Sequence, residues 1–424
     1  MQKKLIALAV ASVASGAAFA QTNVTLYGVA DAGYVYSTGS ASDIAGVRVP
    51  GSNTFSGVQS GLLSGSRIGF RGEEALGNGL KAIFTLEYGI NVDTNSGIGN
   101  TDTGLNARQQ FVGLSGERWG SITLGRQYAP GYQATANNDP AGGAVFEPQS
   151  FLSAQAGNSI TPNSPARWNN AIAYTTPNWS GFSAKAIYSF GERQDADKSY
   201  NDRLVGVGDN GSWGIGANYA NGPINVDLVY QQRTNVYSTK TTANGQDSYS
   251  TILSTPGFNT TLPVATAAAT LVTQELYGRK PTDAEINAAS ALLANDGHSI
   301  NEWYIGGSYD FKVVKVMASY QAQNDNNPLN LDNKLWTLGA VIPVLSASNI
   351  RLGYGQLIWD NPINGKTNSA MLGWTTALSK RSTLYAGYVW TRNDSNSLNL
   401  GPVSGVGGIG ETNNTFLAGI NHAF

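Results

Sequence analysis

Few residues in this chain have the types and spacing that enzymatic chemistry requires. The 424 residues include two histidines, His298 and His422, and no cysteine. A Ser-His-Asp triad or a zinc site needs a histidine close to its partners, whereas the pattern predicts a loop around His298 and a strand around His422. No G-x-S-x-G nucleophile motif is present. The residues therefore predict no enzyme and no metal or cofactor site.

Two glycine-rich stretches match the G-x-G-x-x-G phosphate-binding pattern, at residues 206–211 and 405–410. Such glycines bind a dinucleotide where they follow a strand and open a helix, and neither stretch has that context. Both are interpreted as loop glycines. The balance of 26 basic against 28 acidic residues also argues against a nucleic-acid partner, since nucleic-acid-binding surfaces are strongly basic.

The first twenty residues have the features of an export signal. Lys3 and Lys4 precede a short apolar stretch, and Ala18-Phe19-Ala20 is a small-residue cleavage pattern. We predict a signal peptide at residues 1–20 and a mature chain of residues 21–424. Loss of the two lysines leaves 24 basic against 28 acidic residues, a net charge of −4.

Side chains alternate with period two along most of the mature chain. Between residues 182 and 190, Phe182, Tyr188 and Phe190 occupy one face and Lys185 the other. The same alternation recurs in residues 213–219, 224–231, 314–321, 349–358 and 383–390. Aromatics near the ends of the apolar faces are typical of a lipid-facing band, whereas the core of a soluble β-sandwich would not need them there.

Connections alternate between short and long. Short turns are predicted near residues 77–79, 117–118, 177–181, 221–223, 312, 343–347 and 379–381. Long loops are predicted at residues 38–61, 92–104, 129–166, 192–210, 236–300 and 393–412, with shorter ones at 325–332 and 360–366. The pattern predicts an all-β fold: a transmembrane antiparallel barrel of about sixteen strands, with short periplasmic turns and long extracellular loops.

The loop at residues 236–300 is unusually long. Within it, Pro281 precedes a capping box at residues 282–285, and apolar residues follow at helical spacing up to Leu293. We predict a short helix there, on the extracellular side.

Several motifs together resemble those of the general porins, the trimeric sixteen-stranded diffusion channels of the Gram-negative outer membrane. They are LYG at residues 26–28, SRIGFRGE at 66–73, RQQFVGL at 108–114, LGRQY at 124–128 and the terminal Phe424. The resemblance covers the whole mature chain. It implies a homotrimer in outer-membrane lipid whose third long loop, residues 129–166, folds into the barrel and narrows it for passive diffusion of small hydrophilic solutes and ions.

The resemblance also implies an arginine wall across the constriction from acidic residues of that loop. The basic side is assigned to Arg67, Arg71, Arg108 and Arg167. Arg67 and Arg71 alternate with Ile68 and Phe70, Arg108 is opposite in parity to Phe111, and Arg167 is opposite in parity to Trp168, so all four are expected to face the lumen.

The acidic side is assigned to Asp139 and Glu147, with Glu87 on the lumen face of a neighbouring strand. Arg126 shares parity with lipid-facing residues and is expected at the subunit interface. The last strand, ending at Phe424, is interpreted as the signal through which the barrel assembly machinery recognises the chain.

The arginines outnumber the carboxylates at the expected constriction, which predicts weak anion selectivity. Two other functions remain open. A substrate-specific channel would need a file of aromatic residues along the lumen, and none is evident. An adhesin would place its function in the long surface loops.

Overall fold

The computed structural model describes residues 23–39, 43–44, 47–48, 54–94, 106–191, 211–236, 240–243, 246–249, 298–326, 332–360, 364–394, 397, 399, 401–402, 406 and 410–424. The predicted signal peptide and the predicted helix before Leu293 lie outside the described residues.

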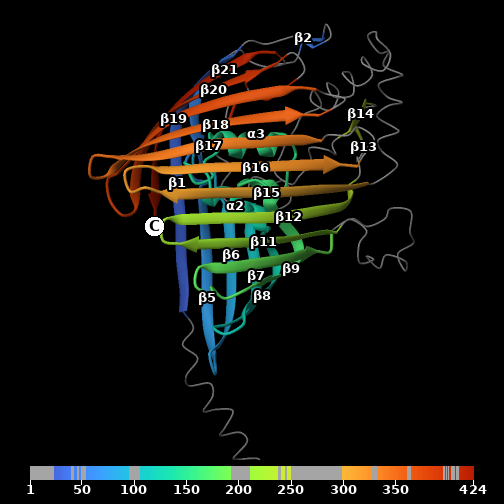
Figure 1. Cartoon of the computed structure of the whole chain (residues 1–424), viewed down its shortest axis with the longest axis vertical. Coiled ribbons are helices and arrows are strands. Elements are labelled where there is room, and N and C mark those ends of the chain that lie inside the picture. Colours follow the sequence, from blue (N-terminus) through green and yellow to red (C-terminus); the bar gives the residue numbers. More distant parts are fainter. Residues whose placement is uncertain are drawn as a thin grey trace, which may run out of the picture.

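One antiparallel sheet curls around the molecule (Figure 1). Its strands are β1 (Asn23–Gly39), β4 (Thr54–Ser60), β5 (Arg67–Gly77), β6 (Leu80–Gly89), β7 (Ala107–Gly116), β8 (Gly120–Tyr128), β9 (Arg167–Thr175), β10 (Phe182–Ser189), β11 (Ser212–Asn221), β12 (Ile224–Val236), β15 (His298–Asp310), β16 (Lys315–Asp325), β17 (Asn333–Val344), β18 (Ser348–Trp359), β19 (Lys366–Ala377), β20 (Ser382–Asn393) and β21 (Thr412–Ala423). Two separate hairpins pair β2 (Asp43–Ile44) with β3 (Val47–Arg48) and β13 (Lys240–Ala243) with β14 (Gln246–Tyr249).

The first strand closes the sheet into a barrel. One edge of β1 pairs with β21, where Ala32 lies opposite Ile420. The other edge pairs with β4 over residues 32–38 and with β5 over residues 23–29, so β4 and β5 share one position. The seventeen strands of the sheet therefore fill the sixteen positions of a closed antiparallel barrel, which confirms the predicted fold class.

Short turns and long connections alternate around the barrel, as predicted. Between β5 and β6 the chain reverses through Asn78 and Gly79, whose φ angles of 52° and 77° suit a tight hairpin. The next connection, residues 90–106, is long, and a short turn at residues 117–119 follows it. Alternation of this kind separates a rim of turns from a rim of loops.

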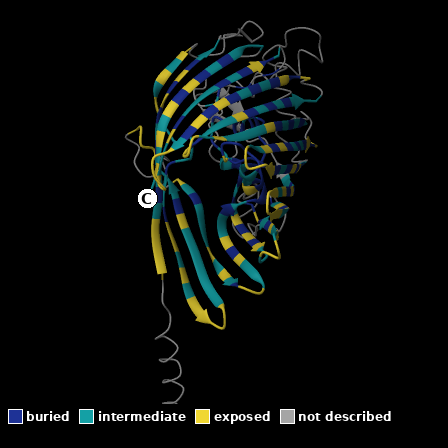
Figure 2. Ribbon diagram, turned by 60° about the vertical axis from the view of Figure 1, so that its left-hand side comes forward, coloured by how far each residue is buried: buried dark blue, intermediate teal, exposed yellow. Residues whose placement is uncertain are grey.

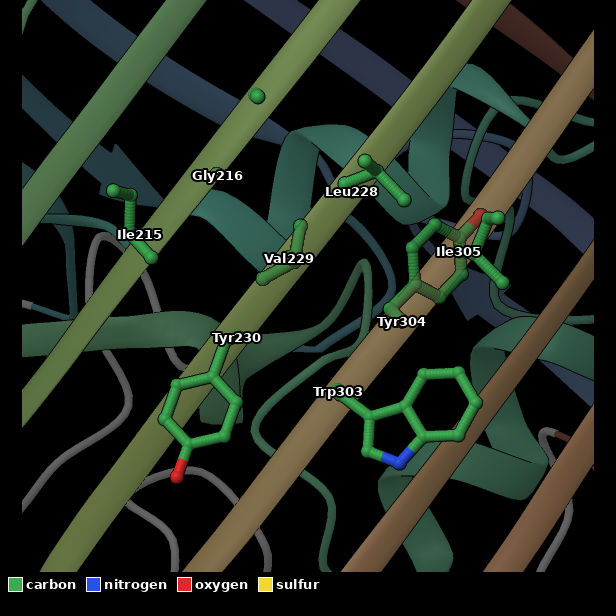
Figure 3. Close-up of a pocket in the computed structure, with 9 residues that line it drawn as sticks. Ile215, Gly216, Leu228, Val229, Tyr230, Trp303, Tyr304 and Ile305 are labelled. Atoms are coloured by element: carbon green, nitrogen blue, oxygen red, sulfur yellow. The ribbon is translucent and has the colours of Figure 1, made fainter.

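Buried and exposed residues alternate along the strands (Figure 2), and many large apolar side chains lie on the exposed outer face. On β12, Leu228 is 51% exposed, whereas its neighbours Asp227 and Val229 are buried toward the interior. Figure 3 shows the same alternation across three strands: Leu228, Trp303 and Ile305 border a shallow apolar hollow on the outer face, and the ring of Tyr304 turns inward. This outer face is suited to contact with lipid acyl chains.

Aromatic side chains pair across neighbouring strands on much of this surface. The pairs are Trp213–Tyr230, Trp303–Tyr320, Trp336–Tyr354 and Tyr388–Phe416, with ring centroids 4.7–5.3 Å apart. Such rings are favoured at the level of the lipid headgroups. Among the described residues, no helix is both long and apolar enough to cross a membrane.

The third long connection, residues 129–166 and here named L3, folds into the barrel. It contains α2 (Pro130–Asn137), α3 (Pro148–Gln155) and the 3-10 helix η1 (Ser164–Ala166). A proline at the start of each α-helix removes an N–H that would have no partner there. Phe146 and Leu152 of L3 are buried against the wall residues Leu335, Leu357 and Tyr385. The predicted inward fold of this loop is confirmed.

Candidate functional site

Strand parity directs the first two predicted arginines into the barrel. Phe70 lies between Arg67 and Arg71 on β5, and it is exposed on the outer face, where it pairs with Leu26 and Leu86. The two arginines therefore point to the interior. Four residues of extended strand separate them by about 13 Å, so Arg71 lies closer to the periplasmic turn.

Arg108 and Glu87 form a buried ion pair on the same side of the interior. Nε of Arg108 donates to Oε1 of Glu87 at 2.7 Å, and both side chains are at most 10% exposed. The Tyr27 hydroxyl donates to the other carboxylate oxygen of Glu87 at 3.0 Å. Nη2 of Arg108 donates to the Tyr128 hydroxyl at 3.1 Å. The carboxylate of Glu87 thus neutralises the charge of Arg108.

Arg167 lies over two stacked tyrosines where L3 leaves and rejoins the wall. The rings of Tyr128, at the end of β8, and Tyr132, in α2, have centroids 3.7 Å apart and are nearly parallel. The guanidinium carbon of Arg167 is 5.6 Å from the first ring and 5.8 Å from the second. Its Nη1 also donates to the Ser164 hydroxyl at 3.1 Å. Cation–π contacts of this kind hold a charged group in a fixed orientation.

A fifth cation completes this side of the interior. Lys185 on β10 extends its ammonium to the carbonyl oxygen of Tyr128 at 2.6 Å. Arg67, Arg108, Arg167 and Lys185 are here called the basic cluster. Arg71 is exposed, and its guanidinium carbon lies 5.2 Å from the centre of the Tyr27 ring.

Asp139 and Glu147 lie in L3, buried against another part of the wall. Asp139 accepts from the Ala141 N–H at 2.6 Å, and Glu147 caps α3 by accepting from the Gln149 N–H at 2.8 Å. The cation that interacts with Asp139 is Arg351 of β18, whose guanidinium also donates to a carbonyl oxygen of L3. The structure thus brings Glu87 to the basic cluster, and it pairs Asp139 and Glu147 near β18.

The two L3 carboxyl groups have raised pKa values. Burial raises the pKa of Asp139 to about 7. Burial, and then the negative charge of Asp139, raise the pKa of Glu147 well above its ordinary value. Each carboxyl group therefore holds its proton more strongly than an exposed carboxyl group does, which lowers the negative charge of L3 near neutral pH.

Wall carboxylates anchor both arms of L3. Asp227 of β12 accepts from the side-chain amides of Asn138 at 2.8 Å and Asn137 at 3.3 Å, at the end of α2. Glu302 of β15 accepts from the backbone N–H of Ser159 at 2.7 Å, on the returning arm. These contacts fix the loop against β12 and β15.

The remaining predicted residues lie at the outer face and at the closure. Arg126 lies opposite Gln110, and Gln110 lies opposite Leu86, whose side chain is exposed on the outer face. Nε of Arg126 donates to the Ala107 carbonyl at 2.9 Å. The backbone of Phe424 exchanges two hydrogen bonds of 3.1 Å with Gly28 where the barrel closes.

Tyr128, Tyr132 and Lys185, which build the basic side of the site, were not among the predicted site residues. Period two already predicted an interior direction for Lys185, opposite Phe182, and that signal could have found it. The stacking of Tyr132 on Tyr128 depends on the inward path of α2, which local spacing does not encode. Among the described residues, no group of three carboxylate, imidazole or thiolate side chains is arranged to hold a metal ion.

Comparison with known proteins agrees with this architecture. Residues 7–396 match the Gram-negative porin family. The chain is 32% identical to outer membrane porin protein 32 of Delftia acidovorans, over 100% of both chains, and 29% identical to an outer membrane porin protein of Bordetella pertussis, over 93% of this chain and 95% of that one. It also superposes on the anion-selective porin from Comamonas acidovorans with a TM-score of 0.67 and 26% identity, covering 95% of this chain and 100% of that one.

The sheet closes into a sixteen-position barrel with an apolar outer belt, and a long loop folds into its interior. The family match over most of the chain agrees with these structural features. The chain belongs to the Gram-negative porins, outer-membrane β-barrels that act as passive diffusion channels.

Proposed function

We propose that the channel is weakly anion-selective and that the basic cluster sets this preference. One observation carries the proposal: Glu87 is ion-paired with Arg108, which leaves Arg67, Arg167 and Lys185 in excess on that side of the interior. The raised pKa values of Asp139 and Glu147 reduce the opposing negative charge near neutral pH. Local charge at a constriction governs permeation, because charges farther away are screened over about 8–10 Å at physiological salt.

The likeness to a porin described as anion-selective supports the same direction. The mature net charge of −4 points the other way. It counts every charge of the mature chain, whereas screening limits the effective charges to those within about 8–10 Å of the permeating ion.

The test is the zero-current potential of single channels under a salt gradient. The parent channel should lean toward anions, and Arg67→Ala combined with Arg167→Ala should move the potential toward cations. Arg381→Ala is the matched control, because Arg381 is an exposed arginine in the turn before β20. A strongly cation-selective parent, or an unchanged potential in the double variant, would contradict the proposal.

We also propose a homotrimer whose subunits meet through the outer faces of β5–β8. The aromatic pairs of the lipid-facing belt lie on β11–β21, whereas the outer row through Leu86, Gln110 and Arg126 carries polar side chains among aliphatic ones. Polar groups are costly against lipid but acceptable against a second copy of the chain. We further expect the barrel assembly machinery to recognise the C-terminal strand that ends at Phe424.

A further inference from the structure

A second segment besides L3 enters the barrel, between β4 and β5. Residues 61–66, here named the inner turn, leave the wall where β1 changes its partner from β4 to β5. Leu62 is fully buried and packs in the same cluster as Phe146 of L3 and Tyr385 of the wall. The backbone N–H of Val145 in L3 donates to the carbonyl of Leu62 at 3.2 Å. The inner turn therefore braces L3 from the side opposite its β12 and β15 anchors.

Asp31 of β1 binds the backbone of the inner turn through its carboxylate. Its fully buried carboxylate accepts from the backbone N–H groups of Leu62 at 2.8 Å, Leu63 at 3.4 Å and Ser64 at 3.2 Å. Successive N–H groups that converge in this way form an anion-binding nest, which here contains a side chain of the same protein.

Two side-chain donors and the backbone complete the attachment. The Tyr385 hydroxyl donates to Asp31 at 2.8 Å, and the Asn421 amide donates at 2.7 Å. The Ser66 hydroxyl donates to the Asp31 carbonyl at 2.9 Å, and the Asp31 N–H donates to Ser66 Oγ at 3.0 Å. Both carboxylate oxygens of Asp31 thus accept hydrogen bonds from neutral donors. In Asp31→Asn the NH₂ group would face one set of these donors and could not accept their hydrogen bonds.

The inner turn also touches the basic cluster. Nη2 of Arg67 donates to the Ser64 hydroxyl. A Cβ on Gly65 would lie 3.0 Å from Nη1 of Arg108, so the backbone of the turn lies directly against that guanidinium. One short segment therefore contacts L3 through Leu62 and the arginine wall through Ser64 and Gly65.

We propose that the inner turn is a second constriction element of the channel, and that Asp31 is the positioning residue that holds it. Because the turn fixes both L3 at Val145 and the Arg67 side chain, it sets the narrowest width of the pore. This inference rests on the channel function and is independent of the direction of ion selectivity. Its test therefore uses neutral solutes.

The experiment compares Asp31→Asn with the parent protein in planar bilayers and in liposome-swelling assays. Releasing the turn should increase open-channel current noise. It should also increase the swelling rate with a neutral disaccharide relative to that with a monosaccharide. Asp310→Asn is the matched control, because Asp310 accepts a backbone hydrogen bond from Lys312 in the turn after β15, outside the interior. That control should leave both quantities at the parental values.

Leu62→Ala gives a second, independent perturbation if Asp31→Asn does not fold. It removes the side chain that packs on Phe146 and retains every hydrogen bond to Asp31, and the same rise in noise and in relative disaccharide uptake is expected. Parental noise and parental sugar discrimination in the folded variants would overturn the proposal. A changed zero-current potential with unchanged sugar discrimination would also overturn it, because the turn would then act on charge and not on width.

Discussion

Oε1 of Glu87 lies 2.7 Å from Nε of Arg108 inside the barrel, with both side chains nearly excluded from solvent. The carboxylate of Glu87 neutralises one positive charge of the basic cluster. Two other arginines of the basic cluster, Arg67 and Arg167, bond instead to the hydroxyls of Ser64 and Ser164. Removal of the Glu87 carboxylate therefore leaves one more uncompensated positive charge in the cluster.

Glu87→Gln should shift the zero-current potential further toward anions, because it leaves the Arg108 charge uncompensated. Removing one partner of a buried ion pair costs about 3–5 kcal/mol, so a lower thermal midpoint is also expected. Glu73→Gln is the control: its pair with Lys81 is exposed, with 41% and 54% of the two side chains accessible, and screening makes it weak. A shift toward cations in Glu87→Gln would refute this account of the pair.

Gly28→Ala should weaken the closure of the barrel. A Cβ on Gly28 would lie 2.3 Å from the ring of Phe424 and 2.7 Å from the carbonyl oxygen of Arg67, and the backbone atom cannot move aside freely. Overpacking of this kind costs about 1–3 kcal/mol. The readout is the fraction of heat-modifiable, folded barrel after refolding in detergent. Gly307→Ala, whose Cβ would meet no atom closer than 3.4 Å, should refold like the parent.

The alternation of apolar and polar side chains predicts the barrel because each strand contacts lipid on one face and the interior on the other. On β12 the prediction holds residue by residue: Leu228 faces outward, and Asp227 and Val229 face inward. Turn residues such as Asn78 and Gly79 mark the strand ends independently of the apolar pattern. The barrel, its strand count and its alternating connections could therefore be predicted from the sequence.

Alternation along a strand assigns side chains to the wrong face where the strand has a bulge. The register shifts between Glu87 and Tyr88, so Phe111 lies opposite Thr85 on the interior row, although alternation assigned it to the outer face. Trp168, also expected outside, is buried, because the chain takes a φ of 46° at Asn170 and the register to β8 shifts there. A bulge leaves little local signal in the sequence, and one inserted residue exchanges the two faces.

The contacts of L3 and of the inner turn could not be predicted from spacing. Asp139 lies near Arg351, which is more than two hundred positions away along the chain, only because L3 folds against β18. Asp31 is part of an alternating strand and has no local feature that indicates five hydrogen-bond donors around it. Such contacts depend on the packed interior, which period two does not specify.

Arg126→Ala should weaken the oligomer more than Arg108→Ala does. Arg126 lies on the outer row with Gln110, whereas Arg108 is buried in the interior. The measurement is the fraction of oligomer in unheated detergent gels. Arg126 also donates to the carbonyls of Ala107 and Arg167 in its own subunit, so the thermal midpoint of the barrel must be recorded in parallel. A larger oligomer loss in Arg108→Ala at equal barrel stability would contradict an interface at Arg126.

The attachment of L3 to the wall should weaken as pH rises from about 4 to about 7. The carboxyl groups of Asp139 and Glu147 have raised pKa values in the folded protein, that of Asp139 near 7, against about 3.9 and 4.3 in an unfolded chain. In this window the docked state binds more protons than the released one, so the free energy of releasing L3 falls as pH increases. Open-channel current noise should therefore be lower at pH 5 than at pH 8.

Asp139→Asn combined with Glu147→Gln tests whether this carboxyl pair is the cause. The two amides cannot titrate, and their oxygens can still accept from the Ala141 and Gln149 N–H groups. The double variant should therefore retain a docked L3 and show a much smaller change in noise between pH 5 and pH 8. Glu117→Gln, in the exposed turn between β7 and β8, should keep the parental pH dependence. A full pH response in the double variant would assign the titration to other groups.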